Sequence, residues 1–347
     1  MGLEDRLEVG VAGLDDRFEE LVACLGGFYC TWYVFTGLEL GLFEALREAG
    51  PAGLAAGELA ARAGVEPSLA ARWAWGADAF ELVTTADGRI RVPGDVAAIL
   101  LDADRPAFLG GQFQFAAVGS LDFGQLPEVF RTGRPIPKRP DRYRVAIERL
   151  TVQDVAVFFG EVLRAVPQLA ADIRPGSLAI DVHCGGGRWL VAMARRFPEV
   201  ALTGVEFELD SVERARANVA DAGLADRITI EQGSMLSIGH EAEADLVYFQ
   251  YALHLLPDPV GTLRSAWAAV GPRGWLVALD WYLPTDPDEL RTAHGELTAG
   301  VQLDEAVQGT RLVTSSEALG WFAAAGLPMA ELVDLPSGAS AIVVRRA

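Results

Sequence analysis

The most constraining feature of the sequence is a short apolar run that leads into three consecutive glycines. The run covers residues 178–182 and contains one acid, Asp181, and the glycines are residues 185–187. Residues 189–197 then carry apolar side chains at helical spacing. This order predicts a buried strand, a tight turn and a helix. Glycines let the backbone approach a ligand closely, and the first turn of the helix offers free N–H groups to it.

A second predicted strand also ends in an acid. Residues 200–206 form an apolar run that ends in Glu206, 21 positions after Gly185. In nucleotide-binding α/β folds, an acid about 20 residues past the glycine turn binds the ribose hydroxyls. We therefore expect a nucleoside pocket at these two strand ends. The dinucleotide fingerprint requires a further glycine where this chain has Leu190, so a nicotinamide oxidoreductase ranks last among the alternatives.

The pattern acid-x-x-x-Gly-x-Gly, from Asp181 to Gly187, resembles motif I of the class I S-adenosylmethionine (SAM) methyltransferases. Residues 227–235 and 244–250 resemble the third and fourth strands of that family, in the same order. The resemblance covers nearly the whole chain. The subgroup that it resembles is the O-methyltransferase-like one, which has an N-terminal winged-helix dimerisation domain. It implies an α/β Rossmann-like, seven-stranded methyltransferase domain after a mostly α-helical domain.

The resemblance also implies where SAM binds. Asp181 is expected near the methionine end, Gly185 and Gly187 along the cofactor, and Glu206 at the ribose. The residues expected to bind SAM and its product, S-adenosyl-L-homocysteine (SAH), are Asp181, His183, Gly185, Gly187, Glu206, Phe207, Ser234, Met235 and Gln250.

Two of these residues depart from the family's pattern. His183 stands where motif I usually has glycine, and its imidazole either narrows the SAM site or adds a polar contact of its own. Ser234 stands where the family usually has aspartate, which is expected to weaken one hydrogen bond to the adenine.

The segment after the expected fourth strand contains the candidate catalytic group. In the resembling O-methyltransferases a Leu-His pair here supplies the general base, and this chain has Leu253 and His254. A neutral imidazole suits the removal of a hydroxyl proton near pH 7. The alternative is that His254 caps or packs its helix. The expected substrate contacts are aromatic side chains: Phe113, Tyr251, Trp281 and Tyr282.

The N-terminal third predicts a helical scaffold. Residues 56–92 have the order helix, helix and hairpin of a winged helix, with an Asp-Gly turn in the hairpin. The second helix, residues 68–80, carries Arg72 as its one basic residue, whereas a DNA reader needs several phosphate contacts. We therefore favour a dimerisation scaffold over a DNA-binding regulator. The apolar helix expected over residues 15–49 then supports a homodimer.

Composition excludes several other classes of protein. Of the 347 residues, 51% are hydrophobic and 22% are charged, which is typical of a globular protein with more than one domain. The net charge of −19 disfavours nucleic acids and anionic membranes as partners. The sequence shows no 18-residue apolar run, so we expect no membrane span and no membrane partner. The three cysteines lack a disulfide or metal-site pattern, so we expect no metal and a cytoplasmic setting.

The sequence thus predicts SAM-dependent methyl transfer to a small molecule, with the hydroxyl of a secondary-metabolite-like substrate as the first choice. Because a sulfonium is already an activated donor, positioning and exclusion of water carry most of the rate. The alternative is an enzyme of the same fold that binds SAM but catalyses a non-methylating rearrangement or cyclisation, as His183 and Ser234 suggest. The expected domains are a helical winged-helix domain (1–140), a helical connector (141–175) and a SAM-binding Rossmann-like domain (176–347).

Overall fold

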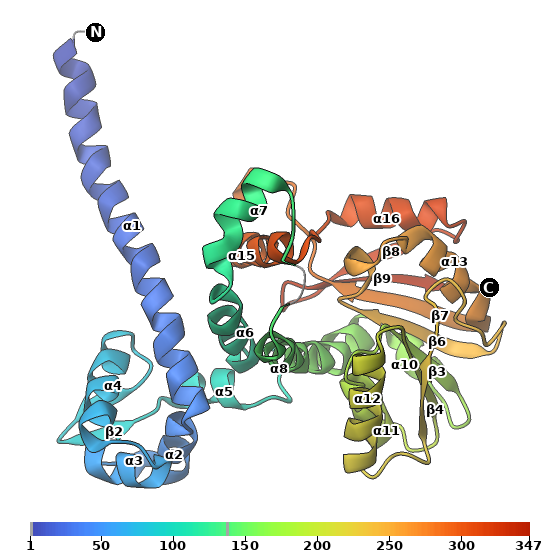
Figure 1. The fold of residues 1–347 in the computed structure, drawn as a ribbon, viewed down its shortest axis with the longest axis horizontal. Coiled ribbons are helices and arrows are strands. Elements are labelled where there is room, and N and C mark those ends of the chain that lie inside the picture. Colours follow the sequence, from blue (N-terminus) through green and yellow to red (C-terminus); the bar gives the residue numbers. More distant parts are fainter. Residues whose placement is uncertain (1–2, 137–138) are drawn as a thin grey trace. The chain divides into compact units, whose positions relative to one another are not determined.

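The computed structural model describes residues 3–136 and 139–347, with side chains from residue 13 onward (Figure 1). By their internal contacts these residues form two units. The first contains the chain up to residue 103 with residues 108–118, and the second contains residues 104–107 with 119–347. The predicted connector, residues 141–175, belongs to the second unit because its helices pack against the sheet there.

The first unit is helical apart from one short hairpin. Its elements are α1 (Leu3–Glu39), α2 (Leu42–Ala49), the 3-10 helix η1 (Gly50–Ala52), α3 (Ala56–Ala63), α4 (Pro67–Ala79), β1 (Thr84–Ala86), β2 (Arg89–Arg91), α5 (Gly94–Leu101) and α6 (Gly110–Ser120). The expected order of helix, helix and hairpin is present in α3, α4 and β1–β2. Asp87 and Gly88 form the hairpin turn, and both have the positive φ that such a two-residue turn requires.

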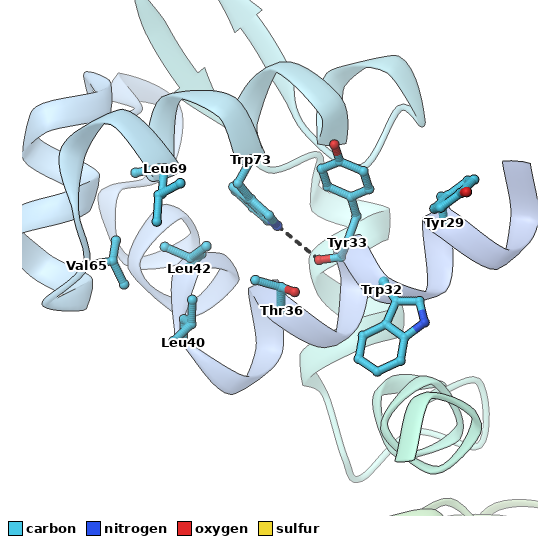
Figure 2. A pocket seen from close by; sticks show the side chains of 10 residues that line it. Tyr29, Trp32, Tyr33, Thr36, Leu40, Leu42, Val65, Leu69 and Trp73 are labelled. Atoms are coloured by element: carbon cyan, nitrogen blue, oxygen red, sulfur yellow. Dashed lines mark hydrogen bonds between the residues drawn. The ribbon is translucent and has the colours of Figure 1, made fainter. Parts of the chain in front are cut away.

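The core of this unit is aromatic. Phe43 of α2 meets Trp73 of α4 edge to face at 5.2 Å between ring centroids. Trp73 also donates a hydrogen bond from Nε1 to the carbonyl oxygen of Tyr33 in α1, at 3.0 Å (Figure 2). This bond satisfies the indole N–H and fixes α4 against α1. Beside it lies an apolar groove of about 450 Å³, whose walls include Tyr29, Trp32 and Leu69.

Helix α1 carries a row of exposed apolar side chains, here called the α1 seam: Leu14, Phe18, Leu21, Leu25 and Phe28. Each is more than half exposed, and they recur at alternating spacings of four and three residues. This is the spacing at which helices pair in coiled coils. The stretch Gly13–Glu39 also has the length and composition of a membrane-crossing helix, which the search for an 18-residue apolar run did not anticipate.

The second unit is a seven-stranded sheet with helices on both faces. The strands are β3 (Leu178–Val182), β4 (Ala201–Glu206), β5 (Ile228–Gln232), β6 (Ala244–Gln250), β7 (Val270–Asp280), β8 (Glu331–Asp334) and β9 (Ser340–Arg345). The longer helices are α7 (Leu126–Thr132), α8 (Asp141–Val157), α11 (Arg188–Arg196), α12 (Leu209–Asp221), α13 (Pro259–Ala269), α15 (Ala293–Gln308) and α16 (Ser315–Ala324). The shorter ones are η2 (Phe123–Gln125), the π-helix η3 (Phe158–Val162), α9 (Leu163–Ala165), α10 (Pro167–Asp172), η4 (Leu253–Leu255) and α14 (Pro287–Leu290).

The strand order is β5-β4-β3-β6-β7-β9-β8. The first five strands are parallel, and β9 pairs antiparallel with both β7 and β8. The seven-stranded Rossmann-like sheet that the resemblance implied is therefore confirmed. The order reverses at β3, whose neighbours are β4 on one side and β6 on the other. Open α/β sheets bind ligands at such a switch point, beyond the carboxyl ends of the strands.

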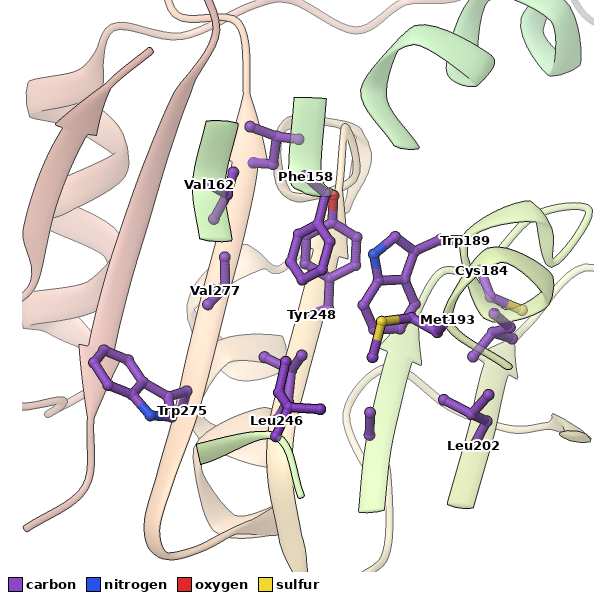
Figure 3. Close-up of a cluster of buried hydrophobic side chains, with 14 of the residues drawn as sticks. Phe158, Val162, Cys184, Trp189, Met193, Leu202, Leu246, Tyr248, Trp275 and Val277 are labelled. Carbon is purple, nitrogen blue, oxygen red and sulfur yellow. The ribbon is translucent and has the colours of Figure 1, made fainter. Parts of the chain in front are cut away.

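Each face of the sheet has its own core. On one face, Trp189 of α11 stacks on Tyr248 of β6 at 4.5 Å, and Phe158 of the π-helix meets Trp189 edge to face at 5.2 Å (Figure 3). The other face packs α13 and α16 through residues such as Leu263 and Phe322. The two faces together hold the strand ends rigidly, which fixes the positions of the side chains that follow each strand.

Candidate active site

The turn after β3 has the backbone conformation that the glycine pattern predicts. Gly185 and Gly187 have φ values of 52° and 71°, and Gly187 caps the start of α11. His183 has a φ of 64°, in a region that side chains other than glycine adopt at a cost of about 1 kcal/mol or more. Its backbone N–H donates to the carbonyl oxygen of Val205 on the neighbouring strand at 2.8 Å.

The carboxylate of Glu206, at the end of β4, is fully buried against this turn. Its oxygens accept hydrogen bonds from the backbone N–H groups of Gly185 (3.0 Å), Phe207 (2.8 Å) and Glu208 (3.1 Å). The Nδ1 atom of His183 lies 3.3 Å from the oxygen that Gly185 also contacts. Glu206 therefore ties the two strand ends together.

These contacts set the charge of each group. Burial raises the pKa of Glu206, but the hydrogen bonds from His183 and the backbone outweigh it, so the pKa of Glu206 lies below its ordinary value. Burial lowers the pKa of His183, but the bond to Glu206 and its charge outweigh that effect, so the pKa of His183 is raised. Burial and the charge of Glu206 raise the pKa of Asp181 to about 8. Asp181 is therefore mostly protonated at neutral pH, whereas Glu206 is ionised.

The remaining expected cofactor residues surround the neighbouring strand ends. Phe207 is 42% exposed and meets the His183 ring edge to face at 5.2 Å. Ser234 follows β5, and its hydroxyl accepts a hydrogen bond from the N–H of Leu236 at 3.2 Å. Met235 is buried, and its side chain packs in the core on one face of the sheet.

Gln250, the last residue of β6, is held by contacts within the protein. Its amide donates to the carbonyl oxygen of Thr151 in α8 at 3.5 Å, and its oxygen accepts from the hydroxyl of Tyr248 at 3.3 Å. Gln250 therefore connects α8 to the end of β6 across the switch point.

His254 lies between two carboxylates. Its Nδ1 atom is 2.8 Å from Asp280, at the end of β7, and its Nε2 atom is 3.8 Å from Glu305 of α15. Burial lowers the pKa of His254, but Asp280 and Glu305 outweigh it and raise the pKa to about 10. The imidazole therefore carries the proton at neutral pH, whereas a general base must begin without it.

Sequence reasoning missed three acids: Asp280 and Glu305, which pair with His254, and Asp154, whose pKa responds to the charge of Asp280. Asp280 is the last residue of β7, and Asp181 is the next-to-last residue of β3. An acid at the end of an apolar run therefore marked both positions in the sequence. Glu305 is brought in by α15, and no local pattern marks it. Asp154 of α8 is 2% exposed, and its Oδ2 atom has no hydrogen-bond partner among the described residues. Burial and the charge of Asp280 raise the pKa of Asp154 well above its usual range.

The aromatic candidates fall into two places. Tyr251 lies after β6 with its ring 6.5 Å from that of His254, and Trp281 follows β7 and stacks on His294 at 6.2 Å. The hydroxyl of Tyr282 is buried without a hydrogen-bond partner in the described part of the chain. Phe113 packs against the aromatic core of the first unit instead. Its contact with substrate stays a prediction.

The structure thus brings the expected residues into two groups. His183, Gly185, Glu206 and Phe207 contact one another at the ends of β3 and β4. His254 pairs with Asp280 and Glu305 beyond β6 and β7. Among the described side chains, no group of three or more His, Cys, Asp and Glu residues is arranged to hold a metal ion.

Comparison with known proteins adds a domain match and partial sequence similarity to the evidence from the sheet. Residues 179–274 match the model of a methyltransferase domain. The chain is 28% identical over 141 residues to the 27-O-demethylrifamycin SV methyltransferase of Amycolatopsis mediterranei, which covers 38% of this chain and 52% of that protein. It is 34% identical over 171 residues to the aclacinomycin 10-hydroxylase RdmB of Streptomyces purpurascens, covering 46% of this chain and 45% of that protein. The chain thus spans about half the length of these curated relatives.

A solved structure extends the likeness to the whole chain. The mitomycin 7-O-methyltransferase MmcR superposes with a TM-score of 0.68 at 22% identity, covering 97% of this chain and 99% of that one. At 22% identity this structural similarity shows a shared fold and nothing more. Residues 179–274 therefore match a methyltransferase domain, and the chain has the fold of the O-methyltransferases.

Proposed function

We propose that this chain is a SAM-dependent methyltransferase that acts on a hydroxyl group of a small secondary-metabolite-like molecule. In this reaction the methyl group moves from the sulfur of SAM to the acceptor oxygen, and the hydroxyl proton is released. The products are the methyl ether and SAH.

The observation that carries the proposal is the turn after β3 together with the buried carboxylate of Glu206. Positive φ values at Gly185 and Gly187 leave the backbone of the turn open to a ligand, and α11 begins directly behind it. The site lies at the switch point of the sheet, in the segment that matches a methyltransferase domain. The residues therefore fit a nucleoside with a charged tail, as SAM has.

In this proposal each end of the cofactor has its own residues. Asp181 and the N-terminus of α11 bind the methionine part, and His183 with Glu206 binds the ribose side. Phe207, Ser234 and Met235 border the adenine, and Gln250 keeps α8 against the site. The sulfonium supplies an activated methyl group, so the protein contributes orientation and the exclusion of water.

His254 is proposed to orient the acceptor, with Tyr251, Trp281 and Tyr282 as walls of the substrate site. As an imidazolium between Asp280 and Glu305 it is a hydrogen-bond donor at neutral pH. It becomes the expected general base only after losing a proton, with a pKa of about 10 in the free protein. Phe113 remains a proposed substrate contact on the sequence argument alone.

The experiment combines binding with product analysis. SAM and SAH are titrated by calorimetry into the wild type and into Glu206→Ala. The wild type is then incubated with SAM that carries a deuterated methyl group and with 27-O-demethylrifamycin SV or hydroxylated aromatic polyketides as acceptors. We expect micromolar binding that the variant loses, and a labelled methyl group on an acceptor oxygen. If neither SAM nor SAH binds the wild type, the proposal is wrong.

A second candidate is a SAM-binding enzyme of this fold that does not transfer the methyl group. It is favoured by the protonated state of His254 and by the relative named as a 10-hydroxylase. The same incubation separates the two, because SAM that is bound but not consumed, together with an altered acceptor that lacks the label, would favour this candidate.

We also propose that the chain works as a cytoplasmic homodimer paired through the first unit. The α1 seam supports the pairing because its residues are exposed at coiled-coil spacing. The cysteines Cys24, Cys30 and Cys184 are unpaired, which suits a reducing compartment.

A further inference from the structure

The carboxylate of Glu206 has no acceptor position left for a ribose hydroxyl. A carboxylate offers about four lone-pair positions, two on each oxygen. One oxygen receives the backbone N–H groups of Phe207 and Glu208, and the other receives that of Gly185. The imidazole of His183 completes the set at 3.3 Å. The side chain of Glu206 is 0% exposed.

The imidazole of His183 is the part of this pair that a ligand can reach. Its side chain is 23% exposed, and Nδ1 is the atom turned toward Glu206. Among the described residues no hydrogen bond reaches its Nε2 atom, which is the free polar atom of the ring. Phe207 packs edge to face against the ring, and the backbone N–H of His183 is bonded to Val205, so both the ring and its backbone are held in place.

We propose that Nε2 of His183 donates the hydrogen bond to the ribose of the bound nucleoside, and that Glu206 is a positioning residue that holds His183. The inference rests on the proposed SAM-binding function and changes the assignment of the ribose contact within it. In the resembling family the acid itself takes the ribose. Here the histidine that replaces a motif I glycine stands between the acid and the ligand.

The charges near the turn support a donor at this position. Burial lowers the pKa of His183, but the bond to Glu206 and its charge outweigh burial and raise it, which favours the protonated imidazole, in which both nitrogens carry hydrogens. The charged or titratable groups that act on it are Glu206 at the end of β4, Glu208 just before α12, and Asp181 at the end of β3. Glu206 and Glu208 both favour the protonated form.

The test is a double-mutant cycle between the protein and the ligand. SAH and its 2′-deoxy and 3′-deoxy analogues are titrated by calorimetry into the wild type, His183→Ala and the control His240→Ala. His240 is also a histidine at positive φ, but it pairs with Glu231 and Glu243 away from this turn. In the wild type we expect removal of one hydroxyl to weaken binding about tenfold or more. In His183→Ala the same removal should change affinity less than about twofold, and His240→Ala should behave as the wild type.

The outcomes separate this inference from the proposed function. If SAH does not bind the wild type, the SAM site itself is wrong. If SAH binds and the loss on removing a hydroxyl persists in His183→Ala, then Glu206 contacts the ribose directly and the inference is overturned. His183→Gly, which keeps the left-handed turn without strain, repeats the test in case His183→Ala folds poorly.

A second measurement tests the positioning role of Glu206. NMR titration of the His183 imidazole gives its pKa in the wild type and in Glu206→Gln. We expect the His183 pKa to fall and SAH binding to weaken in Glu206→Gln, whereas His240→Ala should leave both unchanged. An unchanged His183 pKa would show that Glu206 does not hold the ring.

Discussion

Single acids at the strand ends differ in charge because they differ in the number of donors around them. Glu206 accepts three backbone hydrogen bonds and stays ionised, whereas burial and the neighbouring charge of Glu206 raise the pKa of Asp181 to about 8. His254 is the reverse case, a base held in its charged form by two acids. The same kind of strand-end acid thus serves as an anchor in one place and as a neutral acid in another.

Asp181→Asn should stabilise the protein increasingly as pH rises. The pKa of Asp181 is about 8 when folded, whereas an unfolded aspartate titrates near 4. The folded wild type therefore binds the proton more tightly, and its stability falls as pH rises through this window. Asparagine resembles the protonated acid and lacks this loss, so we expect a gain on the order of 5 kcal/mol near pH 8. Urea unfolding near pH 5 and pH 8 measures it, and an equal difference at both values would contradict it.

Asp280→Asn should destabilise the protein most at low pH. The pKa of His254 is about 10 when folded and near 6.5 when unfolded, so the pairing contributes fully below about pH 6.5 and is lost as pH rises through 10. Breaking a buried pair typically costs about 3 kcal/mol. We expect that penalty near pH 6 and a smaller one near pH 10, measured by urea unfolding. A penalty that does not change with pH would rule out the charged pair.

At the scale of elements, packing between strand and helix depends on glycine at one position of β4. A Cβ atom at Gly204 would lie 2.6 Å from Leu190 of α11 and 2.7 Å from Cys184. Both side chains are buried in the core, so neither has free space to move into. The close approach of β4 to α11 is what keeps the glycine turn and Glu206 in contact.

Gly204→Ala should therefore cost about 1–3 kcal/mol of unfolding free energy. The matched control is Gly300→Ala in α15, where nothing lies within 4 Å of the added Cβ. In the control, helix propensity predicts a gain of about 0.5–1 kcal/mol. Both are measured by urea unfolding. Equal effects of the two substitutions would show that β4 and α11 do not pack as closely as described.

The sequence predicted the strands, their parallel order and the glycine turn because these depend on local apolar runs and on backbone conformation. The positions of Asp181, Gly185 and Glu206 at the strand ends were predicted for the same reason, since strand ends are visible in the chain. It did not predict Glu305 or Asp154, because tertiary packing alone brings Glu305 of α15 to His254 and Asp154 of α8 near Asp280. The protonated state of His254 follows from Asp280 and Glu305 and was equally hidden. It also missed the apolar length of α1, since small and polar residues interrupt the apolar run while the average remains high.

At the scale of the whole molecule, the α1 seam predicts the oligomeric state. Leu21→Glu with Leu25→Glu places two charges on the row of apolar side chains that would face the partner helix. By light scattering after size exclusion, we expect the wild type at twice the mass of one chain and the variant at the mass of one. Glu19→Ala, off the seam, is the control.

Two results would contradict that prediction. If the wild type has the mass of one chain, the α1 seam does not pair with a second copy. Co-sedimentation of the wild type with lipid vesicles, lost in the double variant, would assign the apolar helix to a membrane instead.

The bonds that Glu206 makes have a consequence for the empty enzyme. Because one carboxylate holds both strand ends through backbone N–H groups, the nucleoside cradle keeps its shape with no cofactor present. Little ordering of the chain is then needed when a ligand binds, so binding costs less conformational entropy of the protein. Under the proposed function, SAH would leave and SAM would enter without local unfolding of the turn, so turnover would not wait for refolding of the site.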